Sequence, residues 1–409
     1  MATIAMTPID KEPLRGGRLA QISVAILCVL LLDIPLHPVV AMVFAVAVAL
    51  STTFGQVETG AVYLDYGVLF FYTSSCISTA FAYDVATALP QLTLRTVCTL
   101  IYLACRRREL ISDLVCAVLA VGIIIYCAES LRHFVPAYVK WQSLHFASLV
   151  DFRSSIVLTA NGAKPGDHAA AYVLATTVMV HRMVVSRREL VKFISLLAAA
   201  MSIACMLLSF SRGLYLALAV LLATAIYSLR RSTVLSVNAS SAVLYCLFIF
   251  ALAAAFFRPI GCAIVETALM VSRPSQIASA NGRLAILRTG YSLALHAGVS
   301  GTGLSNYALT LRRSHLAAAH PTAHPLNLVL QIIVEQGYLG LLTLVCAASS
   351  LLIVVINRNR GFQRFALLGG YSALVIYGLT QDYVVADQPT AALLAVYCAI
   401  VANGRGTNG

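Results

Sequence analysis

The sequence predicts an all-α polytopic membrane protein. Of its 409 residues, 60% are hydrophobic and only 11% are charged. A water-soluble protein could not bury this much apolar surface away from solvent. A membrane-spanning helix needs roughly 20 mostly apolar residues, and the chain offers about twelve such runs. They are residues 19–34, 37–54, 62–80, 84–104, 111–128, 168–186, 190–208, 211–229, 237–257, 338–356, 364–381 and 386–402.

Two long segments interrupt the rhythm of short loops and divide the chain. Long connections without regular structure are uncommon in compact proteins and tend to be functional. The predicted divisions are an N-terminal tail at 1–18, nine transmembrane helices over 19–257 with an outer loop at 129–167, a large outer segment at 258–337, three transmembrane helices over 338–402 and a C-terminal tail at 403–409.

The basic residues predict an orientation. Lys and Arg concentrate in the cytoplasmic loops of membrane proteins, and here they gather in the N-terminal tail and in the loops near 106–108, 187–192, 230–231 and 358–364. The loops at 35–36, 81–83 and 382–385 contain neither residue. We therefore expect both termini in the cytoplasm and the two long segments on the outer face.

The large outer segment is basic, although the concentration of Lys and Arg in cytoplasmic loops does not explain basic residues on the outer face. Residues 258–324 contain six arginines and one glutamate, a net charge of +5 with the histidines neutral. Arginine presents a planar fork of donors that suits phosphate, and it stays charged. This composition favours a site for an anionic group. The alternative is a basic surface that meets anionic lipid headgroups.

Three arginines are candidates for contact with that anion. Arg212 lies between two apolar runs, where an arginine is costly unless it faces a cavity or a partner or reaches the interface. Gly213 beside it would let a ligand approach the backbone. Arg283 and Arg288 lie on a helix predicted from about residue 279, and five residues separate them by about 140° in projection. An undistorted helix therefore cannot aim both at one tight clamp.

Two turn-forming stretches border that helix. Ser279 and Asn281 are expected to cap its start. The stretch GVSGTGLSNY at 298–307 is rich in Gly and Ser, which predicts a turn or a nest of backbone N–H groups after its end.

Two histidines stand four residues apart in HPTAHP at 320–325. That is the spacing of a zinc pair on a helix, but Pro321 and Pro325 interrupt such a helix, so we expect no metal. Proline favours the first position of a helix, and a helix that begins near Pro325 would place His324 at the positive end of its dipole. That position favours the neutral imidazole that a general base needs. A purely capping role for His324 is the alternative.

Polar and small residues follow on the same predicted helix. Asn327 lies within one turn of its start, and Glu335, eight residues further, lies loosely on the same side. Gly337 and Gly340 would permit a bend into the apolar run at 338–356.

Three stretches now carry a resemblance to a known family. SFSRG at 209–213, NGRLAILRTGYSLALHAGVSGTGLSNY at 281–307 and HPLNLVLQIIVEQGYLGLL at 324–342 are similar, in order, to segments of the O-antigen ligase and polymerase superfamily; NGAKPGDHAAAYVLAT at 161–176 is a weaker fourth. Members commonly carry His directly before Asn, whereas Leu326 stands there in this chain. His324 and His320 therefore both stay open as the active histidine.

The resemblance implies a glycosyltransferase of lipopolysaccharide biosynthesis with a helical GT-C-like fold. It implies an O-antigen ligase that transfers glycan from undecaprenyl diphosphate to a sugar hydroxyl of the lipid A–core oligosaccharide, with inversion. The site would face the periplasm at the inner membrane of a Gram-negative bacterium. The implied catalytic residues are His324 as base with Arg212, Arg283 and Arg288 on the diphosphate. The implied substrate contacts also include His320, Asn327 and Glu335.

The implied partners are the donor, the acceptor and membrane lipids, with no nucleic acid and no cofactor. No metal is expected, because arginine supplies the positive charge. An O-antigen polymerase or a protein O-oligosaccharyltransferase of the same superfamily is the alternative. A lipid or polysaccharide transporter is a further alternative from another class, although transporters usually carry charges within their spans and show inverted repeats. Most charges here lie at the ends of spans, and Arg95 is an exception.

Overall fold

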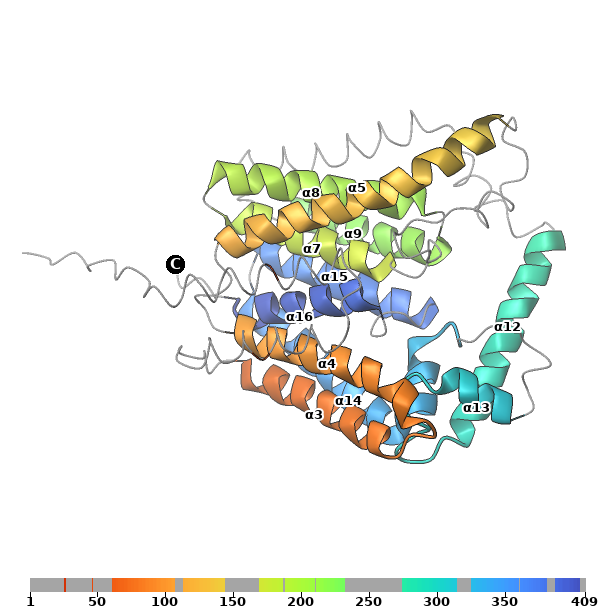
Figure 1. Cartoon of the computed structure of the whole chain (residues 1–409). Helices are drawn as coiled ribbons and strands as arrows, with labels where there is room; N and C mark the ends of the chain where they lie inside the picture. Colours follow the sequence, from red (N-terminus) through yellow and green to blue (C-terminus); the bar gives the residue numbers. More distant parts are fainter. Residues whose placement is uncertain are drawn as a thin grey trace, which may run out of the picture.

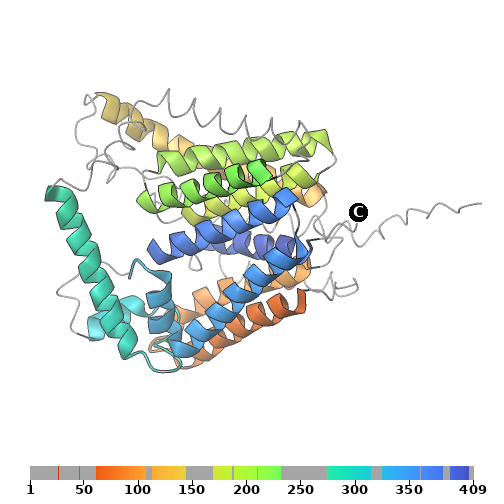
Figure 2. The same ribbon diagram turned by 180° about the vertical axis from the view of Figure 1, so that it is seen from behind.

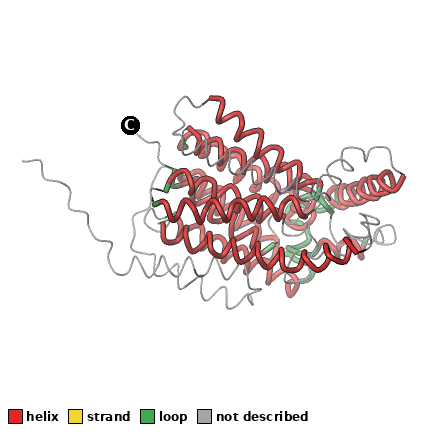
Figure 3. The backbone as a smooth tube through the Cα atoms, turned by 90° about the horizontal axis from the view of Figure 1, so that it is seen from above, coloured by secondary structure: helices red, strands yellow, loops and turns green. Residues whose placement is uncertain are grey.

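The described part of the chain is helical throughout. The structure, a computed structural model, describes residues 61–106, 113–143, 169–186, 188–209, 211–231, 274–314, 325–359, 361–380 and 387–404, with the single positions 26 and 46. These residues contain helices, turns and loops and no strand (Figure 3). The predicted all-α class is confirmed for them.

Most of the expected spans appear as helices close to their predicted bounds. The helices are α3 (Val62–Ala80), α4 (Val85–Cys105), α5 (Asp113–Ser143), α7 (Ala169–Val185), α8 (Glu189–Leu208), α9 (Arg212–Arg231), α12 (Pro274–Leu295), α13 (Tyr307–Arg313), α14 (Leu328–Arg358), α15 (Gly361–Thr380) and α16 (Gln388–Ala402). The expected spans 19–34, 37–54 and 237–257 lie outside the described residues.

Four of these helices are long and apolar enough to cross a membrane. They are Val85–Cys105, Asp113–Pro136, Glu189–Leu208 and Leu328–Arg358, while Ala170–Val185, Gly213–Tyr227 and Gln388–Ala402 are shorter apolar helices. A membrane-helix character is therefore evident in the described part of the chain, and the count of twelve spans stays a prediction.

The helices pack side by side as one bundle. α3, α4 and α14 lie together at one side, α15 and α16 in the middle, and α7, α8, α9 and α5 beyond them (Figures 1 and 2). Small residues permit the closest contacts, as is common between membrane helices. A side chain at Gly67 of α3 would lie 2.9 Å from the backbone of Ala347 in α14.

Polar residues just before the helices fix several starts. The Asp84 carboxylate accepts from the backbone N–H of Ala86 at 3.0 Å and begins α4, and Asp387 accepts from Thr390 at 3.1 Å and begins α16. A side-chain acceptor at this position satisfies a backbone donor that has no partner within the helix.

Three expected boundaries are wrong. α5 runs on to Ser143, so the predicted outer loop at 129–167 is helical in its first part. α12 begins at Pro274, so Ser279 and Asn281 lie inside the helix and not at its start. Proline suits the first position of a helix, where no N–H is needed.

The third boundary concerns the start of α14, which lies at Leu328 and not at Pro325. Leu326 has a left-handed φ of 54°, which no helix continues through, and Asn327 caps the start instead. The predicted bend is confirmed at Gly337, whose φ of 70° and ψ of −168° interrupt α14. α14 thus consists of a short first piece before Gly337 and a long second piece after it.

The two ends of the bundle differ. At one end, where the C-terminus lies, Arg106 pairs with Asp65 at 2.7 Å and Arg182 pairs with Asp113 at 2.8 Å (Figure 1). Arg106 and Arg358 also bond there to the end of α16, at Asn403 and Ala402. α12 and α13 lie at the opposite end, with the turn at 81–84 (Figure 1). Which of the two ends faces the cytoplasm stays a prediction.

Candidate functional site

A glycine-rich loop connects α12 to α13. We call residues 298–306 the glycine loop. Its backbone is left-handed at Gly298, Gly301, Gly303 and Ser305, with φ of 66°, 71°, 105° and 57°. The turn or nest predicted from GVSGTGLSNY is therefore confirmed. Only glycine adopts several such angles in succession without steric cost.

The glycine loop is bonded to the break in α14. Thr302 donates its backbone N–H to the carbonyl of Val334 at 3.0 Å, and Gly303 donates to the carbonyl of Glu335 at 2.9 Å. In return, Leu339 donates its N–H to the carbonyl of Val299 at 3.1 Å. A side chain at Gly301 would lie 2.4 Å from the Glu335 backbone, so the loop requires glycine there.

The same loop is bonded to the turn between α3 and α4. Tyr83 donates its N–H to the carbonyl of Thr302 at 2.9 Å, and the Asn306 side chain donates to the carbonyl of Asp84 at 3.1 Å. A side chain at Gly303 would lie 2.3 Å from the Cβ of Ala82. Three segments that are distant in the sequence therefore meet at this end of the bundle.

Glu335 lies at the centre of that meeting point and is only 2% exposed. Its carboxylate accepts hydrogen bonds from the backbone of Ser305 and Tyr307, and from Gln331 Nε2 at 3.4 Å. The nest formed by the glycine loop thus holds an anion that belongs to the protein itself.

Arg95 of α4 provides the opposite charge. It is 8% exposed, and hydrogen bonds through Ser75 connect its guanidinium to Gln336, the residue next to Glu335. Its Nη1 donates to Ser75 Oγ at 2.7 Å, and Ser75 Oγ donates to Gln336 Oε1 at 3.2 Å. The guanidinium also lies 5.2 Å from the ring centroid of Phe71. Arg95, unexplained in the sequence, is therefore a member of a buried polar cluster.

Several buried polar atoms of this cluster have no hydrogen-bond partner in the structure. They are Arg95 Nε, Gln331 Oε1, Gln336 Nε2 and Asn306 Oδ1. Buried polar atoms are normally satisfied, and exceptions occur at functional or water-filled sites. Sequence reasoning missed the glutamines and serines of the cluster. The sequence feature that indicated the cluster was Arg95, an arginine inside an apolar run.

Asn327 lies at a second junction. Its Oδ1 accepts from the N–H of Leu330 at 3.0 Å, and its Nδ2 donates to the carbonyl of Leu379 in α15 at 2.9 Å. Gly213, next to Arg212 at the start of α9, faces Thr380, the residue that follows Leu379 in α15. A side chain at Gly213 would lie 2.7 Å from Thr380 Oγ1. The starts of α9 and α14 therefore converge on the last turn of α15.

Gly213 was expected to admit a ligand, and that expectation is wrong. Thr380 occupies the space beside it, so glycine permits helix packing there. The Arg212 side chain, His320 and His324 lie outside the described residues. Pro325, which directly follows His324 in the sequence, is described and buried.

The two arginines of α12 lie on different sides of the helix. Among the side chains of α12 that the structure describes, those of Ile286, Leu293 and Ala294 are buried, as is Gly290. Arg283 precedes Gly290 by seven residues, which brings it to within about 20° of the same side, whereas Arg288 lies about 160° away from Gly290. Both side chains are exposed. Arg283 therefore continues the side of α12 that faces α14.

That side of α12 leads to Pro325. A side chain at Gly290 would lie 3.4 Å from Pro325 Cβ and 3.2 Å from Leu330 Cδ1. Leu293 and Ala294 of α12 share a small apolar core with Tyr307, Leu311 and Val334. α12 is thereby fixed to α13 and to the first piece of α14, before Gly337.

Arg313, at the end of α13, lies against the turn between α3 and α4. Both side chains are exposed, but the Arg313 guanidinium lies 4.7 Å from the ring centroid of Tyr83. A hydrogen bond from the Thr87 hydroxyl at 2.6 Å lowers the pKa of Asp84 below its ordinary value, and the charge of Arg313 lowers it further. Arg313 therefore supports the turn at 81–84.

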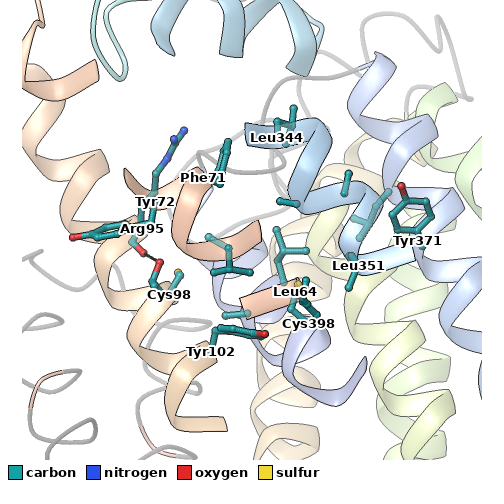
Figure 4. Close-up of a pocket in the computed structure, with 18 of the residues that line it drawn as sticks. Leu64, Phe71, Tyr72, Arg95, Cys98, Tyr102, Leu344, Leu351, Tyr371 and Cys398 are labelled. Atoms are coloured by element: carbon teal, nitrogen blue, oxygen red, sulfur yellow. Dashed lines mark hydrogen bonds between the residues drawn. The ribbon is translucent and has the colours of Figure 1, made fainter. Parts of the chain in front are cut away.

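An apolar cavity of about 230 Å³ lies between α3, α4, α14, α15 and α16 (Figure 4). Its lining includes Leu64, Phe71, Leu344, Leu351 and Cys398, and it reaches Leu328 at the start of α14. Arg95 is the one charged residue among those that line it. The cavity can accept a hydrocarbon group and offers a charge at a single point.

No group of three His, Cys, Asp or Glu side chains has metal-binding geometry among the described residues.

Asn327 and Glu335, both predicted to contact substrate, have different surroundings in the structure. Asn327 caps the start of α14 beside α15, and Glu335, within α14, faces the glycine loop.

Comparison with known proteins bears on the segment that carries these features. No curated protein matches the chain. Residues 197–345 match the family model described as O-Antigen ligase. The matched segment contains α9, α12, the glycine loop and the broken start of α14, and so every site residue predicted from the sequence. Over residues 197–345 the chain is therefore similar to the O-antigen ligase family.

Proposed function

We propose that the protein is an O-antigen ligase of lipopolysaccharide biosynthesis. It takes the O-antigen glycan from undecaprenyl diphosphate and transfers it to a sugar hydroxyl of the lipid A–core oligosaccharide. It works as a multi-pass protein of the inner membrane with its site on the periplasmic side. The observation that carries the proposal is the convergence of α9, α12 and α14, within the family-matched segment, at the end of the bundle away from the buried ion pairs.

The diphosphate of the donor is assigned to the arginines at this end. Arg283 lies on the side of α12 that faces Pro325, and Arg212 begins α9 beside the last turn of α15. Their guanidinium groups would bind the diphosphate and stabilise the charge that develops as it leaves. Arg288, on the other side of α12, would contact the glycan or a second part of the donor.

The acceptor hydroxyl needs a base, and His324 is assigned to that role with His320 in support. The base removes the hydroxyl proton, the oxygen attacks the anomeric carbon, and the bond from that carbon to the diphosphate oxygen breaks. Undecaprenyl diphosphate leaves with the bonding electrons, and the configuration inverts. Because α14 begins only at Leu328, the helix dipole acts on His324 less than the sequence suggested. The assignment rests instead on its place beside Pro325 and Asn327.

The apolar cavity suits part of the polyprenyl chain. It reaches Leu328, the residue after Asn327, so a donor with its diphosphate near Asn327 could extend hydrocarbon into it. Burial of hydrocarbon against such a lining is favourable.

The proposed reaction is tested with purified His324→Ala and His320→Ala variants and a polyprenyl-diphosphate glycan donor. Loss of a general base typically lowers the rate by about 10²–10⁴-fold. We expect that loss for His324→Ala with donor binding retained, and substantial activity for His320→Ala. The reverse result would move the base to His320, and activity in both variants would remove the histidines from the mechanism.

Ligase and polymerase are distinguished by the lipopolysaccharide of a null mutant. Loss of every glycan-capped core species supports the ligase, whereas a surviving single-repeat cap supports the polymerase. Phosphatase fusions that are active only outside the cytoplasm test the orientation: activity is expected within 274–314 and absent after Arg358.

A further inference from the structure

Glu335 is poorly placed to touch a substrate. It is 2% exposed, and the glycine loop and Gln331 already surround its carboxylate. Its carbonyl is also in use, because Gly303 N–H and Ser78 Oγ both donate to it, at 2.9 and 2.6 Å. The hydrogen bonds of Glu335 are therefore made within the protein, mostly to its backbone.

The glycine loop is the C-terminal anchor of α12. α12 ends at Leu295 and the loop begins three residues later. The loop is held at Val334 and Glu335 on α14, and Tyr338 Oη donates to the carbonyl of Ala294 at 3.3 Å. If the loop detaches from Glu335, the C-terminal end of α12 keeps its apolar contacts but loses one of its attachments to the break in α14, and Arg283 can shift with the helix.

A carboxylate in this interior is stable only if its charge is compensated. The backbone N–H groups of Ser305 and Tyr307 provide part of that compensation. Arg95, which Ser75 connects to Gln336 beside Glu335, brings the opposite full charge into the same buried cluster from the α4 side. Arg95 is itself held by Ser75 and lies against Phe71. Arg95 and Glu335 therefore depend on each other, although they are 240 residues apart in the sequence.

We propose that Glu335 and Arg95 form a buried positioning pair that holds the glycine loop on the break of α14 and thereby sets the position of Arg283. Neither residue touches the reacting atoms. The proposal rests on the function proposed above only for the role of Arg283, and the anchoring of the loop stands without it.

Hydrogen–deuterium exchange of residues 298–306 in the purified full-length protein tests the anchoring directly. Glu335→Asp keeps the charge but withdraws the carboxylate by one methylene from the loop N–H groups. Glu335→Gln keeps an acceptor but leaves Arg95 without its counter-charge. Both variants are expected to speed exchange in the loop. Thr343→Val is the matched control: it is buried on the same helix and bonded to Ser74 at 2.9 Å, and loop exchange should not change.

The double variant Arg95→Met/Glu335→Gln distinguishes positioning from catalysis. It removes both charges and keeps an acceptor for the loop, so loop protection and transfer should recover roughly ten-fold relative to Glu335→Gln alone, within the range measured for coupled residues. If Glu335 were a catalytic group, the double variant would stay inactive although its loop is protected. That outcome overturns the proposal.

Kinetics test whether the pair acts through Arg283. Glu335→Asp should raise the donor KM more than it lowers kcat. When it is combined with Arg283→Lys, the loss should be no greater than for Arg283→Lys alone, because both changes remove the same contact. Additive losses, or unchanged loop exchange in Glu335→Asp, contradict the proposal. If the wild-type protein transfers no glycan, the proposed function fails, while the exchange results still decide the anchoring.

Discussion

Arginine has different surroundings at the two ends of the bundle. At the end that carries the C-terminus, Arg106 is 1% exposed and Arg182 is 8% exposed, and each is paired with an aspartate. At the other end, Arg283, Arg288 and Arg312 are exposed. A buried, paired arginine is fixed by the fold. An exposed guanidinium lies where a phosphate group can reach it.

The comparison shows that a basic loop has no single meaning in a membrane protein. The chain has basic residues at both ends of the bundle. Composition alone would assign one set to membrane orientation and the other to ligand binding. The buried ion pairs give the first set an additional structural role. The same substitution at each end should therefore have different consequences.

The largest effect is expected for Arg283→Lys. Lysine keeps the charge but loses the planar fork, so transfer should fall about 10²-fold, the usual loss when one donor to a developing anion is removed. Arg312→Lys, an exposed arginine on α13, is the matched control and should retain most activity. Initial rates of glycan transfer at equal protein concentration provide the measurement. Equal tolerance at both positions would show that Arg283 is not the phosphate ligand.

Arg106→Lys should affect stability instead. Arg106 Nε and Nη2 reach the two oxygens of Asp65 at 2.7 and 2.9 Å, and lysine cannot reproduce this bidentate contact. We expect a loss of about 2 kcal/mol, as for hydrogen bonds to charged groups, seen as a lower thermal midpoint. The transfer rate per folded molecule should stay near wild type. A kinetic defect without a stability defect would contradict the division between the two ends.

Filling the apolar cavity should have a smaller effect. Ala348 lines the cavity. The larger side chain of Ala348→Phe would displace the equivalent of about two methylenes of the bound prenyl chain. The lost burial corresponds to roughly a ten-fold rise in donor KM. Ser349→Phe, at the exposed neighbouring position, is the control. A donor with a shortened prenyl chain should not distinguish Ala348→Phe from wild type. If both donors respond equally, the cavity does not hold the chain.

The smallest effect concerns pH at the turn between α3 and α4. The pKa of Asp84 is lower in the folded protein than its ordinary value of 3.8, so its contribution to stability is present above about pH 4 and is lost as the pH falls through the folded pKa. Asp84→Asn still caps α4 but cannot titrate. The thermal midpoint of this variant should depend less on pH below about 4 than that of the wild type. An unchanged acid dependence would remove Asp84 from this role.

The sequence predicted local features better than contacts between distant segments. The bend at Gly337 and the loop at 298–306 follow from glycine chemistry, which acts over a few residues. The pairing of Arg95 with Glu335 depends on how α4 packs relative to α14, which no local pattern records. The start of α14 was missed because Leu326 adopts a left-handed backbone, which is rare for leucine and is imposed by its surroundings.

The break at Gly337 leaves carbonyl groups of α14 without partners in their own helix. The carbonyls of Val334 and Glu335 instead accept N–H groups from Thr302 and Gly303. The glycine loop thus completes the C-terminus of a helix to which it is not adjacent in sequence. Its length is therefore set by a helix break more than thirty residues further along the chain. Insertions that most surface loops tolerate should be excluded between 298 and 303, and changes in this loop and at the break are expected to occur together during evolution.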